Sequence, residues 1–227
     1  MTTPKIIPVR IGYSNSNLLV NGANSILIDT GVKGHLQNFK NLFKKYNLEP
    51  DRINLIILTH THNDHTGNLK ELVKLTGAKV LVHRNEYENL KKGFIRIPKG
   101  YSFRTRIIAG LGRLIIPKHA SPKPFTADLL NENEFDLNAF GIDGKIISTP
   151  GHTKGSQSVL IGKKLISGDT LINMPNGVIF PHYAENAKTL LKTWQKLFDL
   201  GVEEIYPGHG KNLRLKKLSL SMKSGKK

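Results

Sequence analysis

Short apolar runs alternate with polar, glycine-containing turns along most of the chain. The first runs predict three strands, at residues 6–9, 17–20 and 25–28. An Asn-Gly pair at 21–22 is typical of a tight hairpin turn between the second and third of these strands. Apolar residues at helical spacing between 36 and 46 predict a helix, and the continuous apolar run at 53–58 predicts a fully buried strand.

The alternation continues after the buried strand. It predicts helices at about 67–75, 85–92 and 187–200 and strands at 79–82, 145–148, 158–161, 164–167 and 203–206. Residues 93–125 break the pattern, because Gly, Pro and Arg gather there around one amphipathic patch. This segment is therefore expected to be an insertion in an otherwise regular scaffold.

Four of the predicted strands end in polar turns that carry His or Asp. The run at 53–58 leads into THTHNDH at 59–65, and the later strands lead to His152, Asp169 and His209. Imidazole and carboxylate are ligands that zinc, iron and manganese accept. A polar loop that happens to hold histidines is the alternative, but three histidines and an aspartate within six positions favour a metal site.

Composition is that of an ordinary soluble domain. The 227 residues are 38% hydrophobic, and no run approaches the roughly 18 apolar residues that span a bilayer. Cysteine is absent, which excludes disulfides and thiolate ligands. The first residues lack the pattern of a signal peptide, so a cytoplasmic protein is expected.

The net charge of +17 is unevenly distributed. Residues 91–124 hold nine basic residues and no acidic one, and residues 211–227 hold seven basic residues and no acidic one. The remaining chain is therefore close to neutral. We expect a domain at 1–210 that carries a basic insertion at 93–125, followed by a basic tail at 211–227.

The ordered motifs of the chain resemble those of the metallo-β-lactamase-fold hydrolase superfamily. The matching motifs are Asp29-Thr30-Gly31, His60-x-His62-x-Asp64-His65, Thr149-Pro150-Gly151-His152-Thr153, Gly168-Asp169-Thr170 and Pro207-Gly208-His209-Gly210. The resemblance extends from about residue 7 to residue 210. It implies an α/β (α+β) fold, an αββα sandwich in which two mixed β-sheets are flanked by helices.

The resemblance also implies a hydrolase with two divalent metal ions, zinc being preferred over iron or manganese. His60, His62 and His152 would bind the first ion, and Asp64, His65 and His209 would bind the second. Asp169 would bridge the two ions. Asp29 would either support these ligands through hydrogen bonds or serve only as a turn residue.

A water held between two divalent cations ionises near neutral pH and can attack a carbonyl. Asp64 and Asp169 are the expected catalytic residues, since they can orient that nucleophile. The motifs are most similar to the glyoxalase II-like branch, which hydrolyses thioesters of acylated glutathione. A thiolate, with a pKa of about 8.5 by analogy with Cys, leaves without a general acid, which favours a thioesterase. However, only 17 residues follow Gly210, where glyoxalase II has a helical domain, and Gly210 stands where that family has Glu.

Other hydrolases of the superfamily are the alternatives. A lactonase usually has Tyr three residues after the bridging Asp, where this chain has Ile172, although Tyr183 could reach the same space. A β-lactamase typically lacks the bridging Asp and is exported. The alternative from another class, favoured by charge alone, is a basic nucleic-acid-binding protein or nuclease.

The basic insertion and a second loop are expected to contact the substrate. Arg104 and Arg106 would cover the cleft and attract an anionic small molecule, unless they belong to a solvated surface. The amphipathic patch could instead lie on a membrane surface or form a homodimer contact. His182 and Tyr183 would line the pocket, or His182 would be an ordinary loop histidine.

Overall fold

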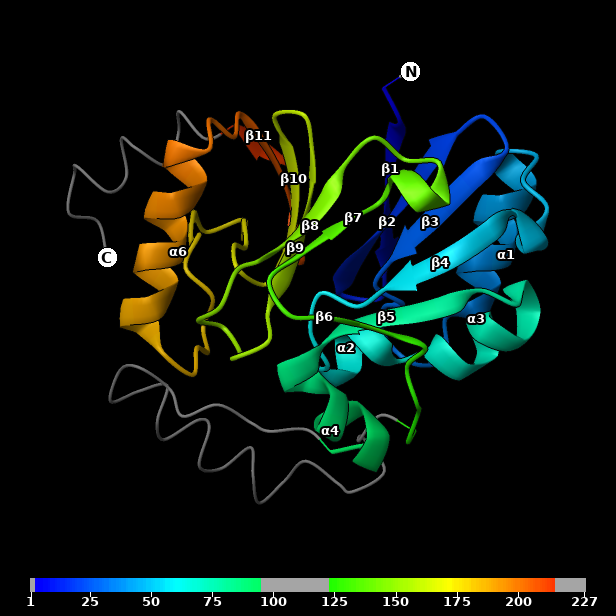
Figure 1. The fold of residues 1–227 in the computed structure, drawn as a ribbon, viewed down its shortest axis with the longest axis horizontal. Helices are drawn as coiled ribbons and strands as arrows, with labels where there is room; N and C mark the ends of the chain where they lie inside the picture. The colour runs from blue at the N-terminus through cyan, green and yellow to red at the C-terminus, as the bar shows by residue number, and fades with distance from the viewer. Residues whose placement is uncertain (1–2, 95–122, 215–227) are drawn as a thin grey trace.

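Two six-stranded sheets pack face to face in the computed structural model, which describes residues 3–94 and 123–214 (Figure 1). The first sheet contains, in spatial order, β1 (Lys5–Ile11), β2 (Ser14–Asn21), β3 (Asn24–Ile28), β4 (Ile53–Ile57), β5 (Lys79–His83) and β6 (Leu129–Asn131). The second contains β12 (Leu213–Arg214), β11 (Glu204–Pro207), β10 (Lys164–Gly168), β9 (Gln157–Ile161), β8 (Lys145–Ser148) and β7 (Glu134–Asp136).

Both sheets are mixed. The strands from β1 to β3 pair antiparallel and those from β3 to β6 pair parallel. Among the described strands of the second sheet, only β10 and β11 pair parallel. Parallel neighbours need crossover connections, and helices occupy them. The α-helices are α1 (Leu36–Lys45), α2 (Asn63–Thr66), α3 (Leu69–Thr76), α4 (Arg84–Lys92) and α6 (Ala187–Asp199), with 3-10 turns η1 (Pro50–Arg52) and η3 (Asn138–Phe140).

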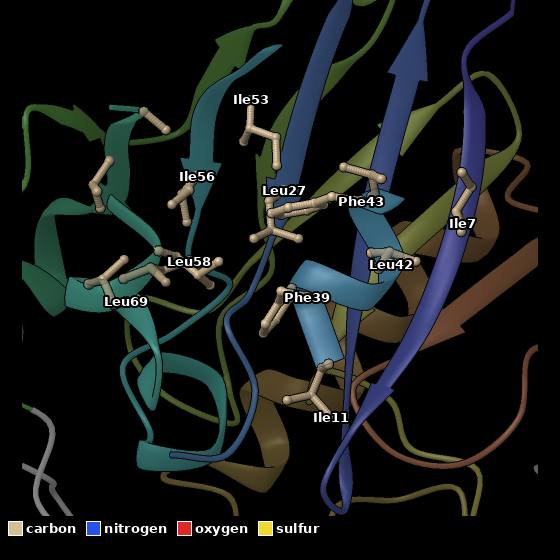
Figure 2. Close-up of a cluster of buried hydrophobic side chains, with 14 of the residues drawn as sticks. Ile7, Ile11, Leu27, Phe39, Leu42, Phe43, Ile53, Ile56, Leu58 and Leu69 are labelled. Carbon is tan, nitrogen blue, oxygen red and sulfur yellow. The ribbon is translucent and has the colours of Figure 1, made fainter. Parts of the chain in front are cut away.

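Three apolar layers hold the sandwich together. Phe39 and Phe43 of α1 pack against Leu27 and Ile56 on the outer face of the first sheet (Figure 2). A second cluster fills the space between the sheets, and a third lies between the second sheet and α6, where Trp194 is buried. The layers therefore run helix, sheet, sheet, helix, and the expected αββα sandwich is confirmed.

Strand β4 shows why a continuous apolar run belongs at this position. Ile56 contributes to the layer beneath the helices, whereas Leu55 and Ile57 face the layer between the sheets. Side chains of a strand alternate between its two faces, so both faces of β4 are buried and both must be apolar. The strand thus holds the THTHNDH loop rigidly at its end.

The prediction differs from the structure in three places. Strands β6 and β7 were not expected, because three residues are too few to show a two-residue period. Residues 63–66, expected to be a turn, form the short helix α2, in which the backbone N–H of Thr66 donates to the carbonyl of His62 at 3.1 Å. The hairpin turn after β1 is shorter than expected, since β2 already begins at Ser14.

Part of the expected domain organisation lies outside the described residues. This holds for most of the insertion at 93–125 and for the tail from 215 onward. The beginning of the tail, at 213–214, forms the edge strand β12, which pairs with β11. Among the described helices, none is long and apolar enough to cross a membrane.

Candidate metal centre

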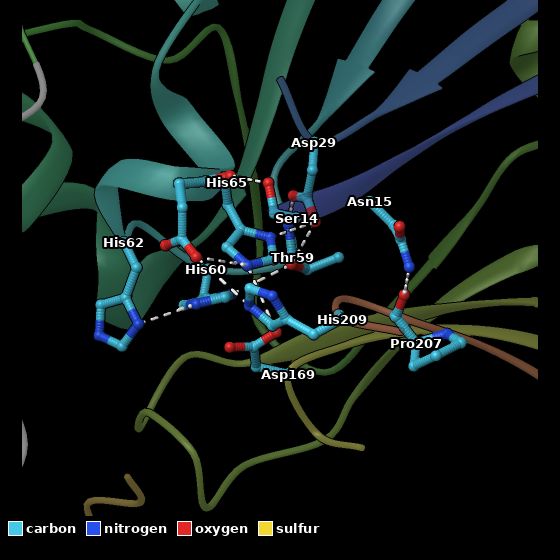
Figure 3. Close-up of polar contacts among 12 residues, drawn as sticks. Ser14, Asn15, Asp29, Thr59, His60, His62, His65, Asp169, Pro207 and His209 are labelled. Carbon is cyan, nitrogen blue, oxygen red and sulfur yellow. Dashed lines mark hydrogen bonds and ion pairs between the residues drawn. The ribbon is translucent and has the colours of Figure 1, made fainter. Parts of the chain in front are cut away.

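The side chains expected at four strand ends meet at one edge of the sandwich. The loop after β4 brings His60, His62, Asp64 and His65, while the second sheet contributes His152 between β8 and β9, Asp169 after β10 and His209 after β11. Figure 3 shows most of these side chains pointing toward one another from both sheets. Their atoms form overlapping groups in which all potential ligand atoms lie within 4.8 Å of each other.

The first group consists of three imidazoles. The Nε2 atom of His60 lies 3.0 Å from the Nδ1 atom of His62, which lies 3.1 Å from the Nε2 atom of His152. Ligands arranged tetrahedrally around zinc at 2.0–2.1 Å are about 3.4 Å apart. Three ring nitrogens at nearly this spacing can converge on a single cation.

The second group combines two imidazoles with a carboxylate. The Nε2 atom of His209 lies 3.3 Å from Oδ2 of Asp64, and the Nε2 atom of His65 lies 3.9 Å from the same oxygen. Asp64 and His65 are neighbours in α2, and the helical turn directs both side chains into the centre. The group can hold a second cation with a more oxygen-rich ligand set.

Asp169 lies between the two groups. Its Oδ1 atom is 3.3 Å from Nε2 of His65 and 3.3 Å from Nε2 of His209. Its Oδ2 atom is 3.6 Å from Nε2 of His152, on the other side. A carboxylate that offers one oxygen to each group is placed to bridge two cations.

Three of the histidines are oriented by acceptors outside the centre. The Nδ1–H group of His65 donates to Oδ2 of Asp29 at 2.8 Å. The Nδ1–H group of His152 donates to the carbonyl of Tyr183 at 2.7 Å, and that of His209 donates to the carbonyl of Tyr13 at 2.9 Å. Such contacts fix the imidazole tautomer and leave the other nitrogen for a metal. Asp29 also accepts from the backbone N–H and the hydroxyl of Thr59, both at 2.8 Å. Of the two expected roles for Asp29, the structure therefore favours support of the ligands.

The two groups differ in their electrostatics. Burial lowers the pKa of His152 to about 4, and burial with the neighbouring imidazoles holds the pKa of His60 well below its usual range. Burial alone would also lower the pKa of His209, but Asp169 and Asp64 beside its ring raise it to about 10. His60 and His152 are therefore neutral at pH 7, whereas the second group attracts positive charge.

Two buried atoms support the presence of a cation in this centre. Nε2 of His65 and Oδ1 of Asp169 are inaccessible to solvent, yet among the described residues neither has a hydrogen-bond partner of acceptable geometry. Buried polar atoms are normally satisfied, so such a pair calls for an explanation. A divalent ion between them would satisfy both, and the donor set suits zinc, iron or manganese.

Close packing around Asp169 depends on Gly208. A Cβ at this position would lie 2.1 Å from Oδ1 of Asp169 and 3.0 Å from Cε1 of His65. Any larger residue would displace these two side chains. The glycine of the PGHG motif thus serves the centre through its small size.

The structure describes three of the five expected substrate residues. Ile172 is buried, and His182 is exposed on a loop. Tyr183 is half-buried and contacts the centre through its carbonyl group, which binds His152. Arg104 and Arg106 lie outside the described residues.

Sequence reasoning missed Tyr13, which lies in the turn between β1 and β2. Its exposed ring stacks on His209, with the ring centroids 6.1 Å apart and the planes within 12°. An aromatic residue beside Gly12 in a hairpin turn was the available signal. Its relevance depends on a contact across 196 positions of sequence, which no local pattern reveals.

Comparison with known proteins finds similar sequences and a similar fold. The probable metallo-hydrolase MJ0888 of Methanocaldococcus jannaschii is 29% identical over 207 residues, covering 88% of this chain and 89% of that protein. A hydroxyacylglutathione hydrolase of Shewanella pealeana is 29% identical over 146 residues, 64% of this chain and 41% of that enzyme. The solved structure of TTHA1623 in a di-iron-bound form has a TM-score of 0.67 at 24% identity, covering 94% of this chain and 96% of that chain.

The family is shown by a match along nearly the whole chain. A family model described as the metallo-beta-lactamase superfamily matches residues 9–209, which include every residue of the centre. The resemblance expected from the motifs is thereby confirmed, and so is the expectation of a hydrolase. This protein is a metallo-hydrolase that belongs to the metallo-beta-lactamase superfamily.

Proposed function

We propose that the protein hydrolyses a thioester of the hydroxyacyl-glutathione type at a centre that binds two divalent metal ions. The single observation that carries the dinuclear centre is the position of Asp169, which turns one oxygen toward His152 and the other toward His65 and His209. His60, His62 and His152 would hold the first ion. Asp64, His65 and His209 would hold the second.

When bound, two divalent cations lower the pKa of a shared water and polarise the carbonyl of the substrate. Residues of the chain orient the water and the substrate. Burial alone would raise the pKa values of Asp64 and Asp169, but nearby histidines lower them. Both carboxylates are therefore ionised at neutral pH and accept hydrogen bonds from the attacking water, which fixes the direction of attack.

Zinc is the metal we propose first. Three imidazoles without a carboxylate in the first group suit its borderline character. Iron is the named alternative, because a solved structure of the same fold contains two iron ions. Manganese is compatible with the oxygen ligands of the second group.

Two observations favour a thioester. Relatives that include hydroxyacylglutathione hydrolases match this chain at 29–31% identity, although the chain spans only 38–41% of those enzymes. The net charge of +17 would also attract an anionic glutathione conjugate. For a lactonase, the position of the usual Tyr is taken by Ile172, whose side chain is buried and lacks a hydroxyl group.

A substrate panel tests the proposal. Full-length protein is stripped of metal, reloaded with zinc, and assayed with a hydroxyacyl-glutathione thioester, a lactone, nitrocefin and a phosphodiester. We expect thioester turnover that is lost on chelation, returns with zinc, and is abolished by Asp169→Ala. Asp143→Ala, at an exposed carboxylate before β8 and outside the centre, is the matched control and should retain activity.

Other outcomes would reject the thioester assignment. Lactone turnover without thioester turnover would identify a lactonase. Metal-dependent cleavage of the phosphodiester, together with salt-sensitive retention on heparin, would identify a nuclease. Retained thioester turnover in Asp169→Ala with two bound ions would contradict the role of the bridging carboxylate.

A further inference from the structure

Glu86 is a buried carboxylate that is not among the seven residues of the metal centre. It lies in the first turn of α4 and is only 2% exposed. Its Oε2 atom accepts hydrogen bonds from the backbone N–H of Thr61, at 3.1 Å, and from the Thr61 hydroxyl. Its Oε1 atom accepts from the backbone N–H of Gly155 at 3.3 Å. All three donors belong to loops that carry metal-binding candidates.

These two loops supply the whole first group. Thr61 lies between His60 and His62, and Gly155 follows His152 by three residues. The first loop extends from the first sheet and the second loop from the second sheet. One carboxylate therefore sets the distance between imidazoles that come from different sheets.

Helix α4 gives Glu86 a fixed position. The helix begins where Nδ1 of His83 accepts a hydrogen bond from the backbone N–H of Asn85, and Leu90 is fully buried in the outer core. A carboxylate on a packed helix can impose its geometry on two loops, because its own backbone has little freedom.

The second group depends on a different support, the first two residues of β2 (Figure 3). The hydroxyl of Ser14 donates to the carbonyl of Asp64 at 2.5 Å. The Nδ2 atom of Asn15 donates to the carbonyls of Pro207 and Gly210, on either side of His209, at 2.9 and 2.8 Å. These contacts support loops of the second group, whereas the contacts of Glu86 support loops of the first group.

We propose that Glu86 is a positioning residue for the first metal position and that Asn15 has the same role for the second. The inference rests on the proposed dinuclear centre. Partners that hold metal ligands in place typically change metal affinity by about 10- to 100-fold when they are substituted. We therefore expect each substitution to weaken one position by this factor and to leave the other position within about twofold.

Glu86→Gln is the most informative change. The amide has nearly the size of the carboxylate, but one of its two terminal atoms becomes a donor and must face an N–H group. Whichever orientation the amide adopts, the link to Thr61 or the link to Gly155 is lost. Glu88→Gln is the matched control, because Glu88 is exposed on the same helix and, within the described part of the chain, forms an ion pair with Lys92 at 3.3 Å.

Variants that keep only one of the two metal positions show which position a substitution weakens. In full-length protein, His209→Ala leaves the first position intact and His62→Ala leaves the second. Zinc affinity is measured by competition with a chromogenic chelator, and circular dichroism verifies folding. Glu86→Gln should lower zinc affinity about 10- to 100-fold in the His209→Ala background and leave it unchanged in the His62→Ala background. Asn15→Ala should give the opposite pattern, and Glu88→Gln should change neither.

Stepwise zinc titration of Glu86→Gln without a second substitution provides an independent measurement. One equivalent should bind more weakly than in the wild-type protein, and the other should be unaffected. Equal weakening of both equivalents would show that Glu86 supports the fold in general, and unchanged affinity would show no positioning role. Either result overturns the inference, whereas a wild-type protein that binds fewer than two equivalents would contradict the proposed function instead.

Discussion

Replacing Asp29 with Asn separates the two roles that this residue could have. Asp29 has a positive φ of 59°, a conformation that Asn tolerates as well as Asp does. If the residue only formed a turn, Asp29→Asn would be neutral. The carboxylate, however, accepts from both donor groups of Thr59 and from Nδ1 of His65, each at 2.8 Å.

The amide cannot reproduce these three contacts. If its oxygen takes the place of Oδ1, which faces the backbone N–H of Thr59, its NH2 group takes the place of Oδ2 beside the Thr59 hydroxyl and His65, and Nδ1 must become an acceptor. The proton of His65 then moves to Nε2, the atom that faces Asp169 and the second metal position. We expect the zinc affinity of that position to fall about 10- to 100-fold.

Without metal, the Asp29→Asn variant should also be less stable than the wild-type protein. A hydrogen bond to a charged group contributes about 1.5–3 kcal/mol, and the substitution removes at least one. For a chain of this length, 1 kcal/mol shifts the melting temperature by about 2–4 °C, so we expect a decrease of about 3–12 °C.

Two measurements on the same variant test this reasoning. Differential scanning calorimetry of the metal-stripped protein gives the melting temperature, and chelator competition gives the affinity for each zinc equivalent. A melting temperature and a pair of affinities equal to those of the wild-type protein would show that Asp29 is only a turn residue. Weakening of the first position rather than the second would refute the tautomer mechanism.

Four further predictions concern stability and metal uptake. Gly210→Glu, which introduces the residue that glyoxalase II has at this position, should lower the free energy of unfolding by more than about 1–2 kcal/mol in urea unfolding. The reason is that φ at Gly210 is +86° and that a Cβ would lie 1.7 Å from the carbonyl oxygen of Asn173. Burial lowers the pKa of His83, because the buried ring favours the neutral form. The stability that the neutral His83 ring contributes is therefore present above pH 6.5 and is lost as the pH falls through the folded-state pKa. His83→Gln should therefore show a smaller loss of stability between pH 7 and pH 5 in urea unfolding. Zinc added to stripped protein at 100 times its dissociation constant should raise the free energy of unfolding by about 2.7 kcal/mol for each site that it fills. At pH 7 the uptake should release protons, detectable with an indicator in weak buffer, because the pKa of His209 is raised to about 10 and its ring must lose a proton to bind metal.

The sequence was most informative where local pattern and chemistry coincide. Strand β4 could be predicted because both of its faces are buried, which requires an uninterrupted apolar run. The residues of the centre could be predicted because five of the nine histidines lie in the polar turns that follow predicted strands. Their common location then followed from the motifs of the superfamily rather than from the spacing of the residues.

Contacts between distant parts of the chain could not be predicted. Glu86 resembles any acidic residue in the first turn of a helix, and only the packing of α4 shows that it reaches Thr61 and Gly155. Asn15 resembles an ordinary turn residue, although its partners lie more than 190 positions away. Polar residues with such roles lack a periodic signal, because their partners are set by tertiary structure.

The division of the centre between the sheets connects fold and function. His60, His62, Asp64 and His65 come from the first sheet, and His152, Asp169 and His209 come from the second. Neither sheet alone brings together a complete ligand set for either ion, since each group draws on both. The metal sites are therefore complete only when the two sheets pack together through the apolar layer between them, and metal bound there would in turn stabilise this packing. Glu86 and Asn15 lie at this same boundary, where a small change in the position of one sheet relative to the other would separate the ligands.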